Sequence, residues 1–194
     1  MSESKHNLLS VIFVTEHVKT VVLSAHKINL LALNAMLLSK RSGQAAVGFG
    51  VISNELRAFS RELARCMKAL DQIAFDSLEK ISVLHKQQRL NSLLVQAASE
   101  SAPLGARALD AYQTRFVGYR DETESRLLQH DQQFAVELEE AGRLGEYGDV
   151  IARFAKIEAA YGNAFAGQLM EIAQEFNTLI RAVMPLIQSL KHNS

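Results

Sequence analysis

Several residue types are scarce in this 194-residue chain, and each scarcity excludes a class of protein. There is no tryptophan, there are two prolines, and the single cysteine, Cys66, excludes an intramolecular disulfide and a thiolate metal cage. The 21 basic and 21 acidic residues balance to a formal charge of zero, so no surplus positive field is present to hold a nucleic-acid backbone. We therefore expect a protein of a reducing compartment with no nucleic-acid partner.

Long apolar runs are scarce near the N-terminus. The most apolar stretch there, Leu8 to Val14, is interrupted by Ser10 and closed by Thr15 and Glu16, whereas a bilayer span needs about 20 apolar residues. The stretch is not followed by the small-residue cleavage site of a signal peptide. We expect no membrane insertion and a cytoplasmic location.

The residues that are abundant favour helices. Low proline content together with many Ala, Leu, Glu, Gln and Lys residues is typical of helical proteins. No segment alternates apolar and polar residues with the period of a strand. Segments that contain glycine or proline divide the chain into four predicted helices, at about 7–42, 50–96, 104–141 and 149–190.

Short connections are expected to join these helices into two long hairpins, about 7–96 and 104–190, because a short turn forces its neighbours to run antiparallel. The first turn lies at Gly43 to Gly48 and the second at Gly142 to Gly148. The predicted fold is therefore all-α: an elongated antiparallel up-down-up-down four-helix bundle made of two long helical hairpins. Residues 1–194 would form a single domain with both turns at the same end.

Apolar residues follow one another at alternating spacings of three and four along each predicted helix, which is typical of bundle seams. Cys66 falls on the second seam and is expected to be a small buried hydrophobe. The first helix carries an additional stripe that widens its apolar face, formed by Leu23, Leu30, Leu33 and Leu37. The last seam is expected to face the core with Val150, Phe154, Ile157, Tyr161, Phe165, Ile172, Phe176, Leu179, Val183 and Leu186.

One segment carries more information than a helical pattern. It reads INLLALNA at Ile28–Ala35, then RSG at Arg41–Gly43, GFG at Gly48–Gly50 and ELR at Glu55–Arg57. This run closely resembles the signalling tip of bacterial methyl-accepting chemotaxis proteins. In that family INLLALNA enters a glycine-bounded hairpin turn, which leaves through GF and an acidic–apolar–arginine triplet. The resemblance covers about residues 25–63, roughly a fifth of the chain.

The resemblance implies a fold and a role. The cytoplasmic domain of the family is a long antiparallel hairpin that dimerises into a four-helix bundle, and its tip binds a chemotaxis histidine kinase, a coupling adaptor and neighbouring receptors. Carried over to the matched tip, residues 41–57, it implies partner binding by Arg41, Gln44, Val47, Phe49, Glu55 and Arg57. Charged residues of the family's tip are replaced here by Leu38, Gln44 and Val47. Of these, Leu38 and Val47 would make a less hydrated tip that associates with itself.

A binding surface requires exposed side chains near the turn. We expect at least partial exposure for Gln44, Val47, Phe49 and Arg57. Val51 and Leu56 are expected to turn inward, and the alternative for Phe49 is a core residue that closes the turn.

The second hairpin is expected to take the place of a second subunit, which would give a single-chain pseudo-dimer with one signalling tip. In the alternative, the first hairpins of two chains pair, and Ile28, Ala32 and Leu56 then contact another chain. A homodimer that uses the outer surface is compatible with the single-chain bundle.

No residue pattern indicates catalysis. The six histidines lack the i, i+3 or i+4 spacing of helix-borne metal ligands, and no phosphate loop, nucleophile elbow or zinc signature occurs. We expect no enzyme, no metal and no cofactor. The leading hypothesis is a soluble chemoreceptor-like protein that presents its tip to a chemotaxis histidine kinase and coupling adaptor, or to chemoreceptors. The alternative is an intracellular sensor bundle that binds a small ligand or cofactor between its helices.

Overall fold

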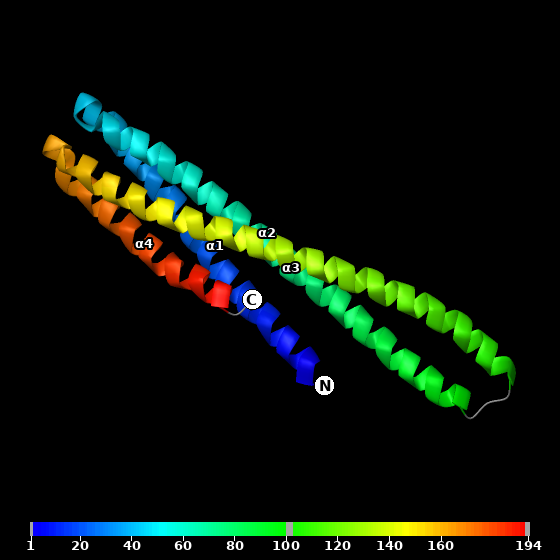
Figure 1. The fold of residues 1–194 in the computed structure, drawn as a ribbon. Coiled ribbons are helices and arrows are strands. Elements are labelled where there is room, and N and C mark those ends of the chain that lie inside the picture. Colours follow the sequence, from blue (N-terminus) through cyan, green and yellow to red (C-terminus); the bar gives the residue numbers. More distant parts are fainter. Residues whose placement is uncertain (1, 100–102, 193–194) are drawn as a thin grey trace. The chain divides into compact units, whose positions relative to one another are not determined.

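A computed structural model describes the backbone of residues 2–99 and 103–192, and the side chains of residues 11–43, 46–97 and 109–192. Two short 3₁₀ turns, η1 (Gly43–Ala46) and η2 (Asn163–Phe165), join helices within hairpins. None of the residues described lies in a β-strand. The helices are α1 (Ser2–Ser42), α2 (Val47–Ser99), α3 (Pro103–Ala160) and α4 (Ala166–His192) (Figure 1). The prediction of an all-α fold with four long helices is confirmed.

The chain divides into two compact units. Unit 1 comprises Met1–Val11 and Ile73–Phe134, and unit 2 comprises Ile12–Gln72 and Ala135–Ser194. The helices α1, α2 and α3 each contribute to both units. That residues 1–194 behave as one domain stays a prediction.

Unit 2 is a four-helix bundle whose two hairpins cover each other. Near the turns, a single core cluster joins the first hairpin to the second, and its members are Ala35, Ala46, Phe49, Ala155, Ala159, Leu169 and Ala173. Both turns of unit 2 therefore lie at the same end, as Figure 1 shows. Ile28, Ala32 and Leu56 are fully buried within the single chain. That the second hairpin takes the place of a second subunit stays a prediction.

The seams predicted for the first two helices lie in this core. Every turn of α1 contributes a buried residue from Val14 to Ala35, and α2 contributes Leu56, Phe59 and Leu63. The rings of Phe59 and Phe176 meet edge to face with centroids 6.3 Å apart. Such a contact adds to the stability that burial of the two rings provides.

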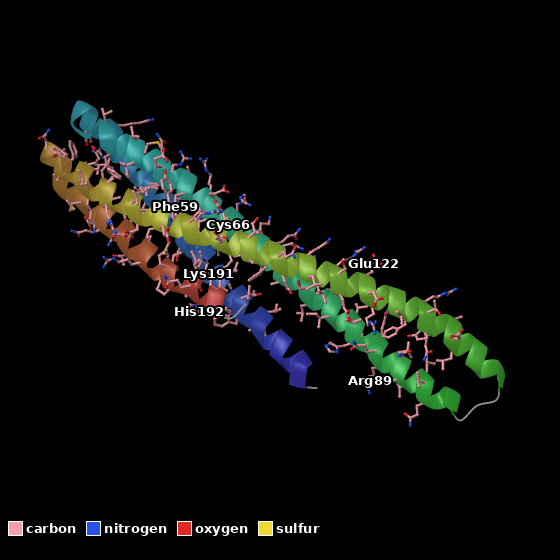
Figure 2. The ribbon with its side chains drawn as sticks, in the orientation of Figure 1. Phe59, Cys66, Arg89, Glu122, Lys191 and His192 are labelled. Carbon is pink, nitrogen blue, oxygen red and sulfur yellow. The ribbon has the colours of Figure 1, made fainter. Side chains whose placement is uncertain are left out.

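The second reversal does not lie at Gly142–Gly148, and the predicted helix boundaries there are wrong. α3 continues to Ala160, and the chain turns at Gly162 and Asn163, whose φ of 49° is one that asparagine tolerates better than most residues. A Cβ atom at Gly148 would lie 2.9 Å from Cε2 of Phe59, which Figure 2 labels, and one at Gly145 would lie 2.1 Å from Sδ of Met184. These glycines allow neighbouring helices to approach α3 closely, and they do not interrupt α3.

The core-facing residues predicted for the last helix are wrong over the part of the chain that belongs to α3. Val150, Phe154 and Ile157 are exposed, and Ala152, Ala155 and Ala159 are buried in their place. Small residues face inward here because the close approach of the helices leaves no room for large ones. On α4 the predicted Phe176 and Val183 are buried.

The additional stripe on α1 is also mostly uncovered. Leu23, Leu30 and Leu37 are each about half exposed, because the inner face of α1 alone fills the core of unit 2. Cys66, in contrast, is fully buried as predicted.

Unit 1 contains a two-helix hairpin made of the second part of α2 and the first part of α3. Ser77 Oγ and His130 Nδ1 are hydrogen-bonded across it at 3.0 Å. Of the side chains described between residues 73 and 134, those of Ala74, Leu84 and Thr123 are buried. Pro103 occupies the first position of α3, where its missing N–H is not needed.

One helix is long and apolar enough to cross a membrane by length and composition, the part of α1 from Val11 to Ser42. That no segment inserts into a membrane stays a prediction. The finding is weak support for a span, because core helices of soluble proteins pass the same test and one face of this helix is buried in unit 2.

Candidate functional site

The turn that resembles the chemoreceptor tip is short and tightly specified. α1 ends at Ser42, and Gly43 adopts a φ of 62°, which L side chains rarely adopt. Lys40 and Arg41 lie in the last turn of α1, where positive charge interacts favourably with the helix dipole. The side chain of Gln44 lies outside the part of the chain whose side chains are described.

A buried serine fixes the two arms of the turn. Ser39 Oγ on α1 donates a hydrogen bond to the carbonyl of Ala46, and both residues are buried. A Cβ atom at Gly50 would come within 2.9 Å of that hydroxyl, so the glycine leaves the space that Ser39 occupies. Ser53 Oγ donates to the Phe49 carbonyl at 2.7 Å one turn further along α2. The GFG sequence thus has a packing role beside any role in binding.

The structure exposes most of the predicted tip residues whose side chains it describes. Arg41, Val47 and Glu55 are exposed. Arg57 is half-buried, and its Nε is buried without a hydrogen-bond partner. These four residues remain predicted contacts.

Phe49 is fully buried, so the expected exposure of this residue is wrong. Its ring belongs to the core cluster that includes Ala155 and Leu169 of the second hairpin. Phe49 therefore closes the end of the bundle as a core residue, which was the alternative stated for it. We remove Phe49 from the candidate surface.

Val51 is 58% exposed, so the prediction that it turns inward is also wrong. Leu56 is fully buried as expected. The inward face of α2 passes through Phe49, Ser53 and Leu56, and a helix that buries this set turns Val51 away from the core. Val47, Val51 and Glu55 then follow one another at intervals of four residues along one exposed face.

The second hairpin reaches the tip through two side chains that the sequence analysis did not single out. Tyr147 Oη donates a hydrogen bond of 2.8 Å to Glu55 Oε2, and this bond raises the pKa of Tyr147 above its ordinary value of 10.0. A Cβ atom at Gly48 would overlap the carboxylate of Glu158, which therefore lies against the first turn of α2. Residues 55 and 147 are 92 positions apart, so no local pattern could have paired them.

We define the tip surface as the exposed or half-exposed residues of this hairpin: Arg41, Val47, Val51, Glu55 and Arg57. It combines two apolar side chains with two cations and one carboxylate. Such a mixed surface is typical of protein interfaces, which place apolar contacts beside charged groups. Among the residues described, no group of three or more His, Cys, Asp or Glu side chains could hold a metal ion.

Comparison with known proteins gives one relevant similarity. The chain is 26% identical over 176 residues to the probable chemoreceptor y4sI of Sinorhizobium fredii. The aligned region covers 91% of this chain and 21% of that protein, so the chain spans about a fifth of the length of the relative. No family model matches the chain, and no solved structure matches it.

Proposed function

We propose that this chain is a chemoreceptor-like signalling protein that presents the tip surface to a chemotaxis histidine kinase, to its coupling adaptor or to chemoreceptors. The observation that carries the proposal is that the run resembling the receptor tip folds as an exposed hairpin end of a four-helix unit. The similarity to a probable chemoreceptor over most of the chain supports the same class of function. We place this activity in the cytoplasm and assign it no catalytic step.

The chemistry of the tip surface supports a protein partner. Val47 and Val51 offer adjacent apolar side chains, both more than half exposed, which would bury area against a partner. Arg41 at the end of α1 and Arg57 on α2 add two cations to the same hairpin end and would supply orientation. Removal of one partner of an interfacial charge pair typically costs 2–5 kcal/mol of binding, so the arginines offer a sensitive test.

The proposal is tested by measuring the affinity of the whole chain for purified coupling adaptor and kinase from a chemotaxis system of the same cell. We expect Val47→Glu and Arg57→Glu each to weaken binding by at least tenfold. Arg115→Glu makes the same charge change on an exposed arginine of unit 1 and is expected to leave affinity unchanged. Equal affinity for all four proteins, or no binding by the wild type to adaptor, kinase or receptor, would overturn the proposal.

The sensor alternative receives less support from the packing. The centre of unit 2 is filled by large side chains, among them Phe49, Phe59 and Phe176, in the position where a ligand between the helices would lie. Native mass spectrometry of the purified protein separates the two functions. A small molecule that co-purifies at one copy per chain would favour the sensor.

A further inference from the structure

The outer face of α3 in unit 2 carries large apolar side chains at heptad-like spacing. We name the set the α3 stripe: Tyr147, Val150, Phe154, Ile157 and Tyr161. The spacings are three, four, three and four, the pattern that seats one helix against another in coiled coils. The exposed fractions run from 44% for Tyr147 to 71% for Tyr161. A seam of this type is therefore present on the surface with its partner helix missing.

The inner face of the same helix is already occupied. Ala152, Ala155 and Ala159 are buried in the core of unit 2, so rotation of α3 cannot bury the stripe without exposing that packing. The largest apolar patch on a soluble monomer typically measures about 300–600 Å² and is often functional. The stripe contains three aromatic side chains, a residue class enriched at the centres of protein interfaces.

A groove of about 450 Å³ runs beside the stripe, between α3 and α4. Its apolar wall is formed by Val150, Ile180, Met184 and Pro185. Its rim carries two acidic and two basic side chains, from Glu146, Asp149, Arg153 and Arg181. Val150 belongs to both features, so the groove begins about one helical turn from the exposed ring of Phe154.

We propose that a second copy of this chain docks on the α3 stripe in antiparallel orientation, with Phe154 of each copy in the groove of the other. A twofold axis between positions 150 and 154 places Phe154 opposite Val150 in both directions. A ring and a groove one turn apart on one helix make the surface complementary to itself, as a twofold interface requires. Tyr147 of the stripe contacts Glu55 of the tip surface, but Phe154 and the groove lie outside that surface, so the dimer is tested with substitutions other than those that test the signalling function.

The charges around the stripe are compatible with a second copy. The chain has a formal net charge of zero, so two copies meet without net repulsion. The groove rim carries both signs in equal number, and twofold rotation brings each rim toward its mate. The same register places Arg143, which is ion-paired with Glu140 at 2.6 Å, opposite Tyr161, where the flat face of the guanidinium can still stack on the ring.

The available area fits a weak, specific dimer. With about 200 Å² for an aromatic side chain, the three rings leave about 300 Å² exposed on each copy, and the whole α3 stripe leaves about 450 Å². Two copies would then bury about 900 Å² before the groove walls are counted. Specific interfaces become stable near about 1,000 Å², a size that the two stripes reach only together with the groove walls.

Sedimentation equilibrium on the full chain tests whether the dimer forms through this surface. We expect the wild type to dimerise and Phe154→Glu to weaken dimerisation by at least 100-fold, since a carboxylate would enter an apolar groove. Phe75→Glu is the matched control, because Phe75 is a similarly exposed ring on α2 in unit 1. A monomeric wild type, or equal weakening by both substitutions, would overturn the proposal.

Disulfide trapping tests the orientation. Val150→Cys and Phe154→Cys variants are prepared separately in a Cys66→Ser background, one of them carrying a size tag, and oxidised alone and together. The antiparallel register predicts a high yield of the mixed 150–154 disulfide when the two variants are oxidised together. Each variant oxidised alone should give a low yield of disulfide-linked dimer. Preferential 150–150 or 154–154 disulfides would indicate a parallel pair and would contradict the proposal. Loss of dimers in Leu30→Glu with retention in Phe154→Glu would move the interface to α1.

Discussion

Units 1 and 2 share the helices α2 and α3, yet the two units bury their apolar residues to very different extents. In unit 2, α1 and α4 complete a bundle in which the largest side chains, such as Phe59, Leu63 and Phe176, are fully buried. In unit 1, Leu84 is the one large apolar side chain that is buried among those described for residues 73–134. Leu90, Leu93, Leu94 and Val95 are between 37% and 55% exposed. The number of apolar residues in a part of α2 therefore does not predict how many of them are buried. Burial depends also on how many helices pack against that part.

The comparison separates two sources of stability. A helix pair hides only the stripe along its own contact, whereas four helices enclose a core on all sides. Stability should therefore be concentrated in unit 2, and unit 1 should open more easily. Each of the following predictions sets a residue of unit 2 against a chemically similar residue of unit 1.

The largest difference is expected for phenylalanine truncation. Phe59→Ala removes a fully buried ring that contacts Phe176 and should lower the free energy of unfolding by about 3–5 kcal/mol. Phe75→Ala removes a ring that is 63% exposed and should change it by less than about 0.5 kcal/mol. Urea unfolding followed by circular dichroism measures both. Similar losses for the two variants would show that the units do not differ as described.

Two glycines of α3 should respond to alanine with opposite signs. A Cβ atom at Gly148 would lie within 3 Å of Ile180 and Phe59, and such overpacking costs about 1–3 kcal/mol. Gly118 has no heavy atom within 4 Å of the same position, so alanine there should stabilise the helix by up to about 1 kcal/mol. Thermal melts of the two single variants check the signs. A stabilised Gly148→Ala would disprove the close helix contact.

Thiol reactivity should report the difference in opening. Burial raises the pKa of Cys66 to about 11, so at pH 8 the native thiol is almost wholly protonated and enclosed. A cysteine placed by Leu84→Cys in a Cys66→Ser background should react with a disulfide reagent at least tenfold faster, which corresponds to about 1.4 kcal/mol. The rates are measured at pH 8 in native buffer. Equal rates would mean that both units open with the same free energy.

The smallest effect is expected at the contact between Tyr147 and Glu55. The hydrogen bond favours the neutral phenol and raises the pKa of Tyr147, so its contribution to stability is complete below pH 10 and is lost as the pH rises through the raised pKa. Glu55→Ala should lower the titration midpoint of Tyr147 toward 10, followed by phenolate absorbance. Glu79→Ala, which removes an exposed carboxylate of unit 1, should leave the titration midpoint of Tyr147 unchanged.

The sequence predicted the helical class, the buried seams of α1 and α2 and the position of the first turn, because all three follow from local spacing. It failed at the second turn, where the signal was the pair Gly162–Asn163 and not the glycines at 142–148. Those glycines are explained by Phe59, Ile180 and Met184, which approach them from other helices. A local pattern cannot distinguish a glycine that bends the chain from one that admits a neighbour.

The sequence also predicted the candidate site only in part. The resemblance placed the tip, and exposure supports Arg41, Val47 and Glu55 as surface residues. The expected positions of Phe49 and Val51 were reversed, because a helix that buries Leu56 and Ser53 turns Phe49 inward and Val51 outward. The contacts of Glu55 with Tyr147 and of Gly48 with Glu158 needed the three-dimensional structure.

The hairpin of unit 1 also bears on how the chain folds. The two halves of unit 2 are separated in sequence by Ile73–Phe134, and closing a flexible loop of roughly 60 residues costs about 3–4 kcal/mol of chain entropy. The hydrogen bond between Ser77 and His130 joins the two ends of this segment, so a hairpin that forms early brings the halves together through local contacts. Deletion of Ile73–Phe134, with α2 and α3 joined so that their helical phase is kept, would then speed folding less than the length of the deleted segment suggests. The reason is that the hairpin already makes the connection between the two halves of unit 2 effectively short.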